Sequence, residues 1–145
     1  LMNDEQRKAI RQQIGMLFQG SALFDSMTVE QNVMFPLDMF TKLNQKEKHE
    51  KVNEVLARVN LTGANNKFPS EISGGMKKRV GIARAIVLNP KFLFCDEPNS
   101  GLDPKTSLVI DKLIKEITTE YGMTTIVNTH DMNSVMEIGD NILFM

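Results

Sequence analysis

The segment from Lys91 to Asp103, KFLFCDEPNSGLD, constrains the fold more than any other part of the sequence. Its apolar residues 92–95 predict a fully buried strand, and two adjacent carboxylates, Asp96 and Glu97, follow at the strand end. Two neighbouring charges at such a place are costly unless they have partners, and a metal ion with a phosphate and a water provides them. The segment therefore predicts a site for phosphate chemistry.

Composition narrows the class of protein. The chain of 145 residues is 41% hydrophobic, which is enough for one domain with its own core. Its 17 basic and 18 acidic residues balance, so we expect no nucleic acid as a partner. The sequence has no run of 18 apolar residues and no charged-then-apolar leader, which predicts a cytoplasmic chain. Cys95 lies in an apolar run, which favours a core residue over a nucleophile.

Strand and helix patterns alternate along the chain. The predicted strands are residues 14–18, 92–95 and 124–127, with a last strand beginning at 141–145. The predicted helices are residues 3–12, 28–35, 46–59, 73–88, 103–121 and a short one ending at 138. Strands that alternate with helices predict an α/β fold with a parallel sheet and covering helices.

Several residues mark the predicted helix boundaries. Thr28 and Gln31 have the spacing of a capping box, and Pro36 is expected to end the helix that they open. Asp103 as N-cap and Pro104 at the first helical position open another helix, which ends at Gly122. Its inward residues are predicted to be Val109, Ile110, Leu113, Ile114 and Ile117.

The helix of residues 46–59 is predicted to be amphipathic. Val52, Val55, Leu56 and Val59 follow the spacing of one buried face. The charged residues are expected to face solvent, and they are Lys46, Glu47, Lys48, Glu50, Lys51 and Glu54. His49 belongs to the same charged face, and we assign it no role.

Polar side chains follow three of the predicted strands: Gln19, Asp96 with Glu97, and His130. Ligands of parallel sheets lie beyond the carboxyl ends of the strands, where these side chains are expected to meet. Asp96 is a candidate magnesium ligand, Glu97 a candidate base for an attacking water, and His130 a candidate donor to a phosphate. Any one of them alone would be read as a strand cap, but the set favours a site.

A second candidate is the turn of Ser73, Gly74 and Gly75, which opens a helix. Unpaired backbone N–H groups and the helix dipole favour an anion there, and glycines allow a phosphate to approach closely. A plain helix cap is the alternative reading of the same turn. We interpret the basic residues that follow as solvent-facing, and they are Lys77, Lys78, Arg79 and Arg84.

Together these residues resemble the ATP-binding subunit of ATP-binding cassette (ABC) transporters, over nearly all 145 residues. The matching motifs are Gln19 for the Q-loop, SGGMKKRVGIARA for the signature, FLFCDE for Walker B, SGLD for the D-loop and His130 for the switch histidine. The resemblance implies a P-loop NTPase-like fold. Its RecA-like core would comprise residues 1–19 and 90–145, and residues 20–89 would form a helical subdomain with the signature helix.

The resemblance also implies roles for the site residues, with ATP as substrate and Mg²⁺ as cofactor. Glu97 would be the catalytic base, Asp96 and Gln19 would serve the metal and the attacking water, and His130 would contact the terminal phosphate. The nucleotide-contacting set would be Ser73, Gly74 and Gly75, which reach ATP on the opposite subunit, and Asp103, which communicates across the dimer.

Partners follow from the same resemblance. A head-to-tail second ATPase subunit and a transmembrane permease are implied, with the permease's coupling helix received by Gln19 and residues 20–72. This arrangement places the protein on the cytoplasmic face of the inner membrane. Met76, where the family usually has glutamine, and residues 16–33 look most like ATPases of Mla-type lipid transporters, which implies a lipid substrate and an MCE-domain partner.

The sequence departs from the family in one respect. A phosphate-binding Walker A loop reads G-x-x-x-x-G-K-[ST], but none of the nine glycines is followed by lysine. We therefore expect an internal fragment of a longer ATPase, without significant ATPase activity by itself. Two alternatives stay open: a non-catalytic module that binds a membrane partner, and a soluble ABC ATPase of translation or DNA repair.

Overall fold

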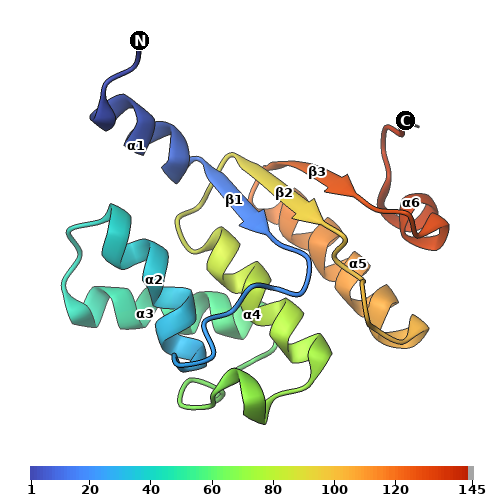
Figure 1. The fold of residues 1–145 in the computed structure, drawn as a ribbon, viewed down its shortest axis with the longest axis horizontal. Coiled ribbons are helices and arrows are strands. Elements are labelled where there is room, and N and C mark those ends of the chain that lie inside the picture. The colour runs from blue at the N-terminus through green and yellow to red at the C-terminus, as the bar shows by residue number, and fades with distance from the viewer. Residues whose placement is uncertain (144–145) are drawn as a thin grey trace.

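The computed structural model describes residues 1–143 (Figure 1). Nine helices and strands of these residues carry the fold, together with a short 3₁₀ helix at Pro69–Glu71. In chain order they are α1 (Asp4–Gln12), β1 (Ile14–Leu17), α2 (Val29–Phe40), α3 (Gln45–Arg58), α4 (Gly74–Ile86), β2 (Phe92–Asp96), α5 (Pro104–Glu120), β3 (Thr124–Asn128) and α6 (Met132–Ile138). The α/β class predicted from the sequence is confirmed.

The three described strands form one parallel sheet in the order β1-β2-β3. Leu17 of β1 pairs with Cys95 of β2, which pairs with Val127 of β3, so all strands end at the same edge. Helices α4 and α5 pack on one face of this sheet (Figure 1). Leu17, Leu93 and Cys95 point to that face and are at most 2% exposed.

The opposite face of the sheet is open in the described residues. Its apolar side chains alternate with the buried ones and are 36–53% exposed; they are Ile14, Met16, Phe92, Phe94 and Ile126. The prediction that strands 92–95 and 124–127 are fully buried is therefore wrong. A run of apolar residues shows that both faces can be covered, but it does not show which segments of chain cover them.

Capping signals set the helix starts. Asn3, Thr28 and Asn44 each form a capping box with the residue three positions on, and the predicted Thr28–Gln31 box is confirmed. The predicted end at Pro36 is wrong, because α2 continues to Phe40. Leu37, one residue past the proline, is 1% exposed, and its packing offsets the backbone hydrogen bond that a proline removes.

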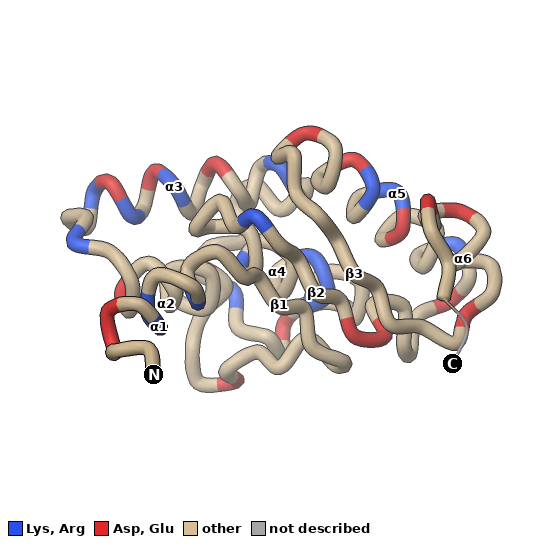
Figure 2. The backbone as a smooth tube through the Cα atoms, turned by 90° about the horizontal axis from the view of Figure 1, so that it is seen from above, with Lys and Arg blue, Asp and Glu red and all other residues tan. Residues whose placement is uncertain are grey.

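Helix α3 buries Val52, Val55 and Leu56, and its C-cap residue Val59 is buried with them, as the spacing predicts. Acidic and basic residues alternate along the rest of the helix (Figure 2). Lys48 was wrongly predicted to face solvent. It is 8% exposed, because its Nζ lies 2.6 Å from Asp38 Oδ1 of α2. The predicted solvent face ignored the neighbouring helix, which supplies this carboxylate.

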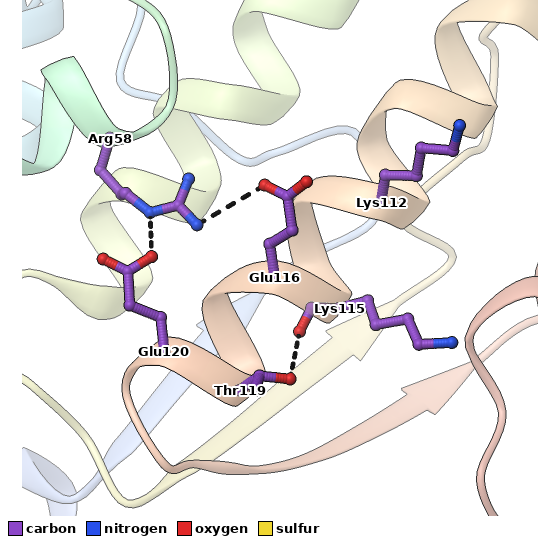
Figure 3. A pocket seen from close by; sticks show the side chains of 6 residues that line it. All are labelled: Arg58, Lys112, Lys115, Glu116, Thr119 and Glu120. Carbon is purple, nitrogen blue, oxygen red and sulfur yellow. Dashed lines mark hydrogen bonds and ion pairs between the residues drawn. The ribbon is translucent and has the colours of Figure 1, made fainter.

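Helix α5 begins and ends as predicted, with Asp103 as N-cap and Gly122, at φ +61°, just past its end. Val109 is wrongly predicted as inward, since it is 44% exposed. On the outer side, Arg58 of α3 forms ion pairs with Glu116, at 3.6 Å, and with Glu120 (Figure 3). These pairs connect α3 to α5 beside a surface groove of about 580 Å³.

The last predicted strand, at residues 141–145, is not found in the described part of that range. Residues 141–143 are not in a strand, and residues 144–145, where that prediction also falls, lie outside the described residues. No helix between residues 1 and 143 is long and apolar enough to span a membrane.

Candidate functional site

The candidate site lies at the carboxyl edge of the sheet. Asp96 ends β2 and pairs with Asn128, which ends β3; Glu97 follows the first strand and His130 lies two residues past the second. The backbone N–H of Glu97 donates to Asn128 O at 2.8 Å, which continues the pairing of the two strands by one residue. The parallel register therefore brings the polar ends of β2 and β3 together, as the sequence predicts.

Glu97 and His130 are in direct contact. Glu97 Oε1 lies 2.8 Å from His130 Nδ1 and also accepts the backbone N–H of His130 at 3.2 Å. The hydrogen bond to Glu97 and then its negative charge raise the pKa of His130 above its usual 6.5. The His130 side chain is 85% exposed and that of Glu97 is 17% exposed, so the pair is open to a ligand from the histidine side.

Asp96 makes a separate contact at the same edge. Its Oδ1 accepts a hydrogen bond from Asn128 Nδ2 at 2.9 Å, and Asp96 itself is half-buried. Gln19 follows β1 at this edge and is exposed, with no side-chain hydrogen bond to another residue of the described chain. The structure thus brings Asp96, Glu97 and His130 together and leaves Gln19 beside them without a contact.

Lys78 of α4 stabilises the turn that follows Glu97. Lys78 Nζ donates to Glu97 O and to Ser100 Oγ, each at 3.2 Å, and the residue is 3% exposed. Burial lowers the pKa of Lys78, while the charges of Glu97 and Asp96 act in the opposite direction. Interpreting Lys78 as solvent-facing was wrong, because the turn of residues 97–101 covers this side of α4.

Arg84, on the same helix, was also wrongly predicted to face solvent. It is half-buried, and its guanidinium donates to the carbonyls of Ser21 and Ala22 at 2.7 and 2.9 Å. These bonds hold the loop that follows β1 and Gln19. A helical wheel cannot foresee either Lys78 or Arg84, because both donate to the backbone of loops far away in the sequence.

The predicted anion turn opens α4. Ser73 is the N-cap, and its Oγ accepts the N–H of Met76 at 3.2 Å, so the plain-cap reading of this residue holds in the structure. Ser73 and Gly74 are exposed, whereas Gly75 is buried against Thr106, whose Cγ2 would lie 2.7 Å from an added Cβ. A side chain at position 75 would therefore collide with α5.

Asp103 is connected to this turn by Thr106, which contacts both. It accepts from the N–H and the hydroxyl of Thr106 at 3.0 and 2.5 Å, and these bonds lower the pKa of Asp103. Gly75 and Asp103 thus meet the same residue. The structure thus brings the turn of residues 73–75 and the N-cap of α5 together.

The donor set fits a magnesium ion only in part. Carboxylate and amide oxygens are its preferred protein ligands, and one or two carboxylates with waters and phosphates are enough. Asp96 and Gln19 offer such oxygens. Among residues 1–143, no three His, Cys, Asp or Glu side chains are grouped as a metal site of their own. The residues present therefore fit a metal that is held largely by phosphate and water.

Comparison with known proteins shows the family. A sequence profile of the ABC transporter family matches residues 1–100. The chain belongs to the ABC transporter family. Cys95 in its Walker B strand is a core residue as predicted, 2% exposed and with its pKa raised by burial to about 12.

Two proteins of ABC transporters are similar to the chain in sequence. The chain is 43% identical to methionine import ATP-binding protein MetN 1 of Pseudomonas putida, over 99% of the chain and 43% of that protein. It is 46% identical to the probable ribonucleotide transport ATP-binding protein mkl of Mycobacterium bovis, over 92% of the chain and 37% of that protein. The chain thus spans about two-fifths of the length of these relatives.

Two solved ABC structures have the same fold. The dimeric ATP-binding cassette MJ0796 bound to ADP and Pi matches 94% of the chain with a TM-score of 0.80 and 35% identity, over 60% of that structure. The structure of cbiO1 of Clostridium perfringens, part of the ABC transporter complex cbiONQ, matches 94% of the chain with a TM-score of 0.83 and 35% identity, over 55% of that structure.

Proposed function

We propose that the chain is part of the ATP-hydrolysing subunit of an ABC transporter. The observation that carries the proposal is the Glu97–His130 contact beside Asp96 at the carboxyl edge of the sheet. It places a candidate base, a candidate phosphate donor and a candidate metal ligand within one small region. Family membership and two relatives named as transport proteins favour this function over a soluble ABC ATPase or a non-catalytic module.

In this proposal Glu97 is the base that takes a proton from the attacking water. The pairing with Glu97 orients the His130 ring, and the exposed side of that ring is free to donate to the terminal phosphate. Asp96 and Gln19 would hold Mg²⁺ and the water. The metal would supply positive charge to the phosphate oxygens of ATP.

The opposite side of the nucleotide would come from a second subunit. Ser73 and Gly74 are exposed at the start of α4, where free N–H groups and the helix dipole favour an anion. Asp103, close by through Thr106, would report on the same contact. The dimeric form of the MJ0796 cassette supports pairing of two subunits, and the head-to-tail arrangement is what the resemblance implies. Since these 145 residues have no Walker A loop, we propose that they hydrolyse no ATP by themselves.

A permease is the proposed membrane partner, and a groove of about 430 Å³ is the proposed docking site. It lies between β1, the loop after Gln19 and α2. Its apolar lining includes Phe24 and Phe35, whose rings are 5.0 Å apart, and Met39, which is 52% exposed. An amphipathic helix of the permease would insert its apolar face here and anchor the protein to the cytoplasmic side of the membrane.

The proposed subdomain division follows the packing of the helices. Helices α2, α3 and α4 contact one another, which supports a helical subdomain of residues 20–89 beside a RecA-like core of 1–19 and 90–145. The Arg58 pairs to Glu116 and Glu120 would then join the subdomain to the core (Figure 3).

The proposed substrate is a phospholipid or another hydrophobic molecule, with an MCE-domain protein as a further partner. Only the resemblance of Met76 and residues 16–33 supports this finer proposal. The relatives above carry the names of methionine import and ribonucleotide transport instead. Lipid transfer by the reconstituted transporter, measured against methionine uptake, distinguishes these substrates.

The test of the proposed function is ATP hydrolysis by the purified full-length protein with its permease. We expect Mg²⁺-dependent turnover that EDTA abolishes and added Mg²⁺ restores. Introducing a charge into the groove with Met39→Glu should release the permease, while Met136→Glu, on the exposed side of α6, should not. Absence of turnover in the intact complex would contradict the proposal.

A further inference from the structure

A buried polar cluster lies beneath the Glu97–His130 pair. It consists of Asn99, Asp111 and Ser134, which are 7%, 1% and 0% exposed. Asn99 Nδ2 donates to Asp111 Oδ1 at 2.8 Å and to Ser134 Oγ at 2.6 Å, and the Ser134 hydroxyl donates to Asp111 Oδ2 at 2.9 Å. The three side chains thus form a closed triangle of hydrogen bonds.

Each corner of the triangle belongs to a different segment. Asn99 is two residues after Glu97, in the turn between β2 and α5. Ser134 is in α6, four residues after His130. Asp111 is on the buried face of α5, the longest described helix. The triangle therefore ties the loop of Glu97 and the loop of His130 to one rigid helix.

Three features of this region cost free energy of folding, so they are not explained by a contribution to stability. Glu97 has φ +46°, a left-handed backbone that a side chain other than glycine rarely adopts. Asn99 Oδ1 is buried without a hydrogen-bond partner in the described chain, and burial raises the pKa of Asp111 against the hydrogen bonds from Asn99 and Ser134. Such violations of local rules are typical of sites whose geometry serves a function.

The Glu97–His130 contact is held firmly on one side only. The Glu97 backbone donates to Asn128 O and accepts from Lys78 Nζ, whereas His130 lies two residues beyond Asn128. The His130 side chain is 85% exposed, and within the described residues its hydrogen bonds go to Glu97 alone. An exposed ion pair of this kind is weak, so it cannot by itself fix the separation of the two loops. The buried triangle adds a second fixed connection between the two segments, beyond the point where the pairing of β2 and β3 ends.

We propose that Asp111 is a positioning residue, which holds the loops of Glu97 and His130, through Asn99 and Ser134, at the separation where Glu97 and His130 meet. Asp111 touches neither substrate nor metal in this role. The consequence for ATP hydrolysis rests on the proposed function, whereas the consequence for the Glu97–His130 contact does not.

The test compares the NMR signals of the His130 ring at fixed pH in variants of the full-length protein. Glu97→Gln gives the ring signals of a histidine without its carboxylate, and His130→Gln assigns them. We expect Asp111→Ala to move the His130 signals toward those of Glu97→Gln. His49, which pairs with Glu30 on the other side of the molecule, is the internal control and should keep its signals.

A conservative variant separates positioning from simple loss of stability. Asp111→Asn keeps an acceptor for Asn99 and a polar neighbour for Ser134, so it should retain the wild-type His130 signals. Ser134→Ala, which removes only the link to α6, takes the place of Asp111→Ala if the latter fails to fold. Wild-type His130 signals in the folded variant, or a Glu97→Gln variant with unmoved signals, would overturn the proposal.

The rate of ATP hydrolysis gives an independent reading. Asp111→Ala should lower kcat by roughly tenfold to a hundredfold, as a misplaced catalytic group does, with KM for ATP changed by less than about twofold. Asp111→Asn should recover most of kcat. A wild-type protein without turnover would refute the proposed function and leave the NMR test of positioning unaffected.

Discussion

Two contacts join the same pair of loops, and they differ in their surroundings. The Glu97–His130 contact is at the surface, with the histidine 85% exposed. The Asn99–Asp111–Ser134 triangle is inside, with no member more than 7% exposed. A surface contact contributes little to stability but can meet a ligand, while a buried one is costly to break and meets none. The reactive side chains thus lie at the surface, while the hydrogen bonds that hold their loops in place are buried.

The largest effect on stability should come from the buried contact. Asp111→Ala leaves the Asn99 amide and the Ser134 hydroxyl without their shared acceptor, and we expect the free energy of unfolding to fall by about 2 kcal/mol. Chemical denaturation measures it, with Lys112→Ala, at an exposed position of the same helix, as the control. A loss no greater than that of the control would remove the contrast between the two contacts.

A smaller effect is expected at Lys78. Lys78→Met keeps the aliphatic side chain and removes the hydrogen bonds to Glu97 O and Ser100 Oγ, while it also relieves the burial of an ammonium group. We expect a net loss of about 1 kcal/mol in the free energy of unfolding. Lys77→Met, one position earlier and partly exposed, should leave stability unchanged. Equal losses in both variants would show that the support of the turn is not specific to Lys78.

The exposed contact should contribute least to stability and most to turnover. His130→Ala should lower the thermal unfolding midpoint only slightly, because the ring is exposed, yet strongly reduce ATP hydrolysis by the full-length protein. Differential scanning calorimetry and a phosphate-release assay measure the two quantities. A large fall in the midpoint would make His130 a structural residue instead.

The smallest expected effect is the pH dependence of stability at His130. Its pKa is raised in the folded protein by Glu97, so the contribution of the pair is fully present below the ordinary value of about 6.5 and is lost as pH rises through the folded pKa. Stability curves of the wild type and Glu97→Gln should therefore approach each other above that pKa. Curves that separate further with rising pH would contradict the sign.

Much of the fold can be predicted from local signals. The Thr28–Gln31 box, the Asp103 cap and the Gly122 stop are determined by residues within a few positions of each other, and all three are confirmed. Predictions failed where distant segments decide. Leu37 packs in the core and keeps α2 helical past Pro36, and the open sheet face exposes Phe92, although its strand is apolar.

The site could be predicted in part from the expected sheet. Parallel strands end at one edge, so Asp96, Glu97 and His130 could be placed together from the sequence alone. Lys78 could not, because its partners belong to a turn 19 to 22 positions away. Asn99 also lay within the segment that defines the site, but nothing in its spacing showed that it pairs with α5 and α6.

The central claim is that Glu97, presented by this edge of the sheet, is the base for ATP hydrolysis. The most direct test is to measure ATP binding and single-turnover hydrolysis by the full-length Glu97→Gln variant beside the wild type. We predict unchanged ATP affinity and a hydrolysis rate lower by at least about a hundredfold, the scale of a lost general base. Hydrolysis at the wild-type rate would contradict the assignment.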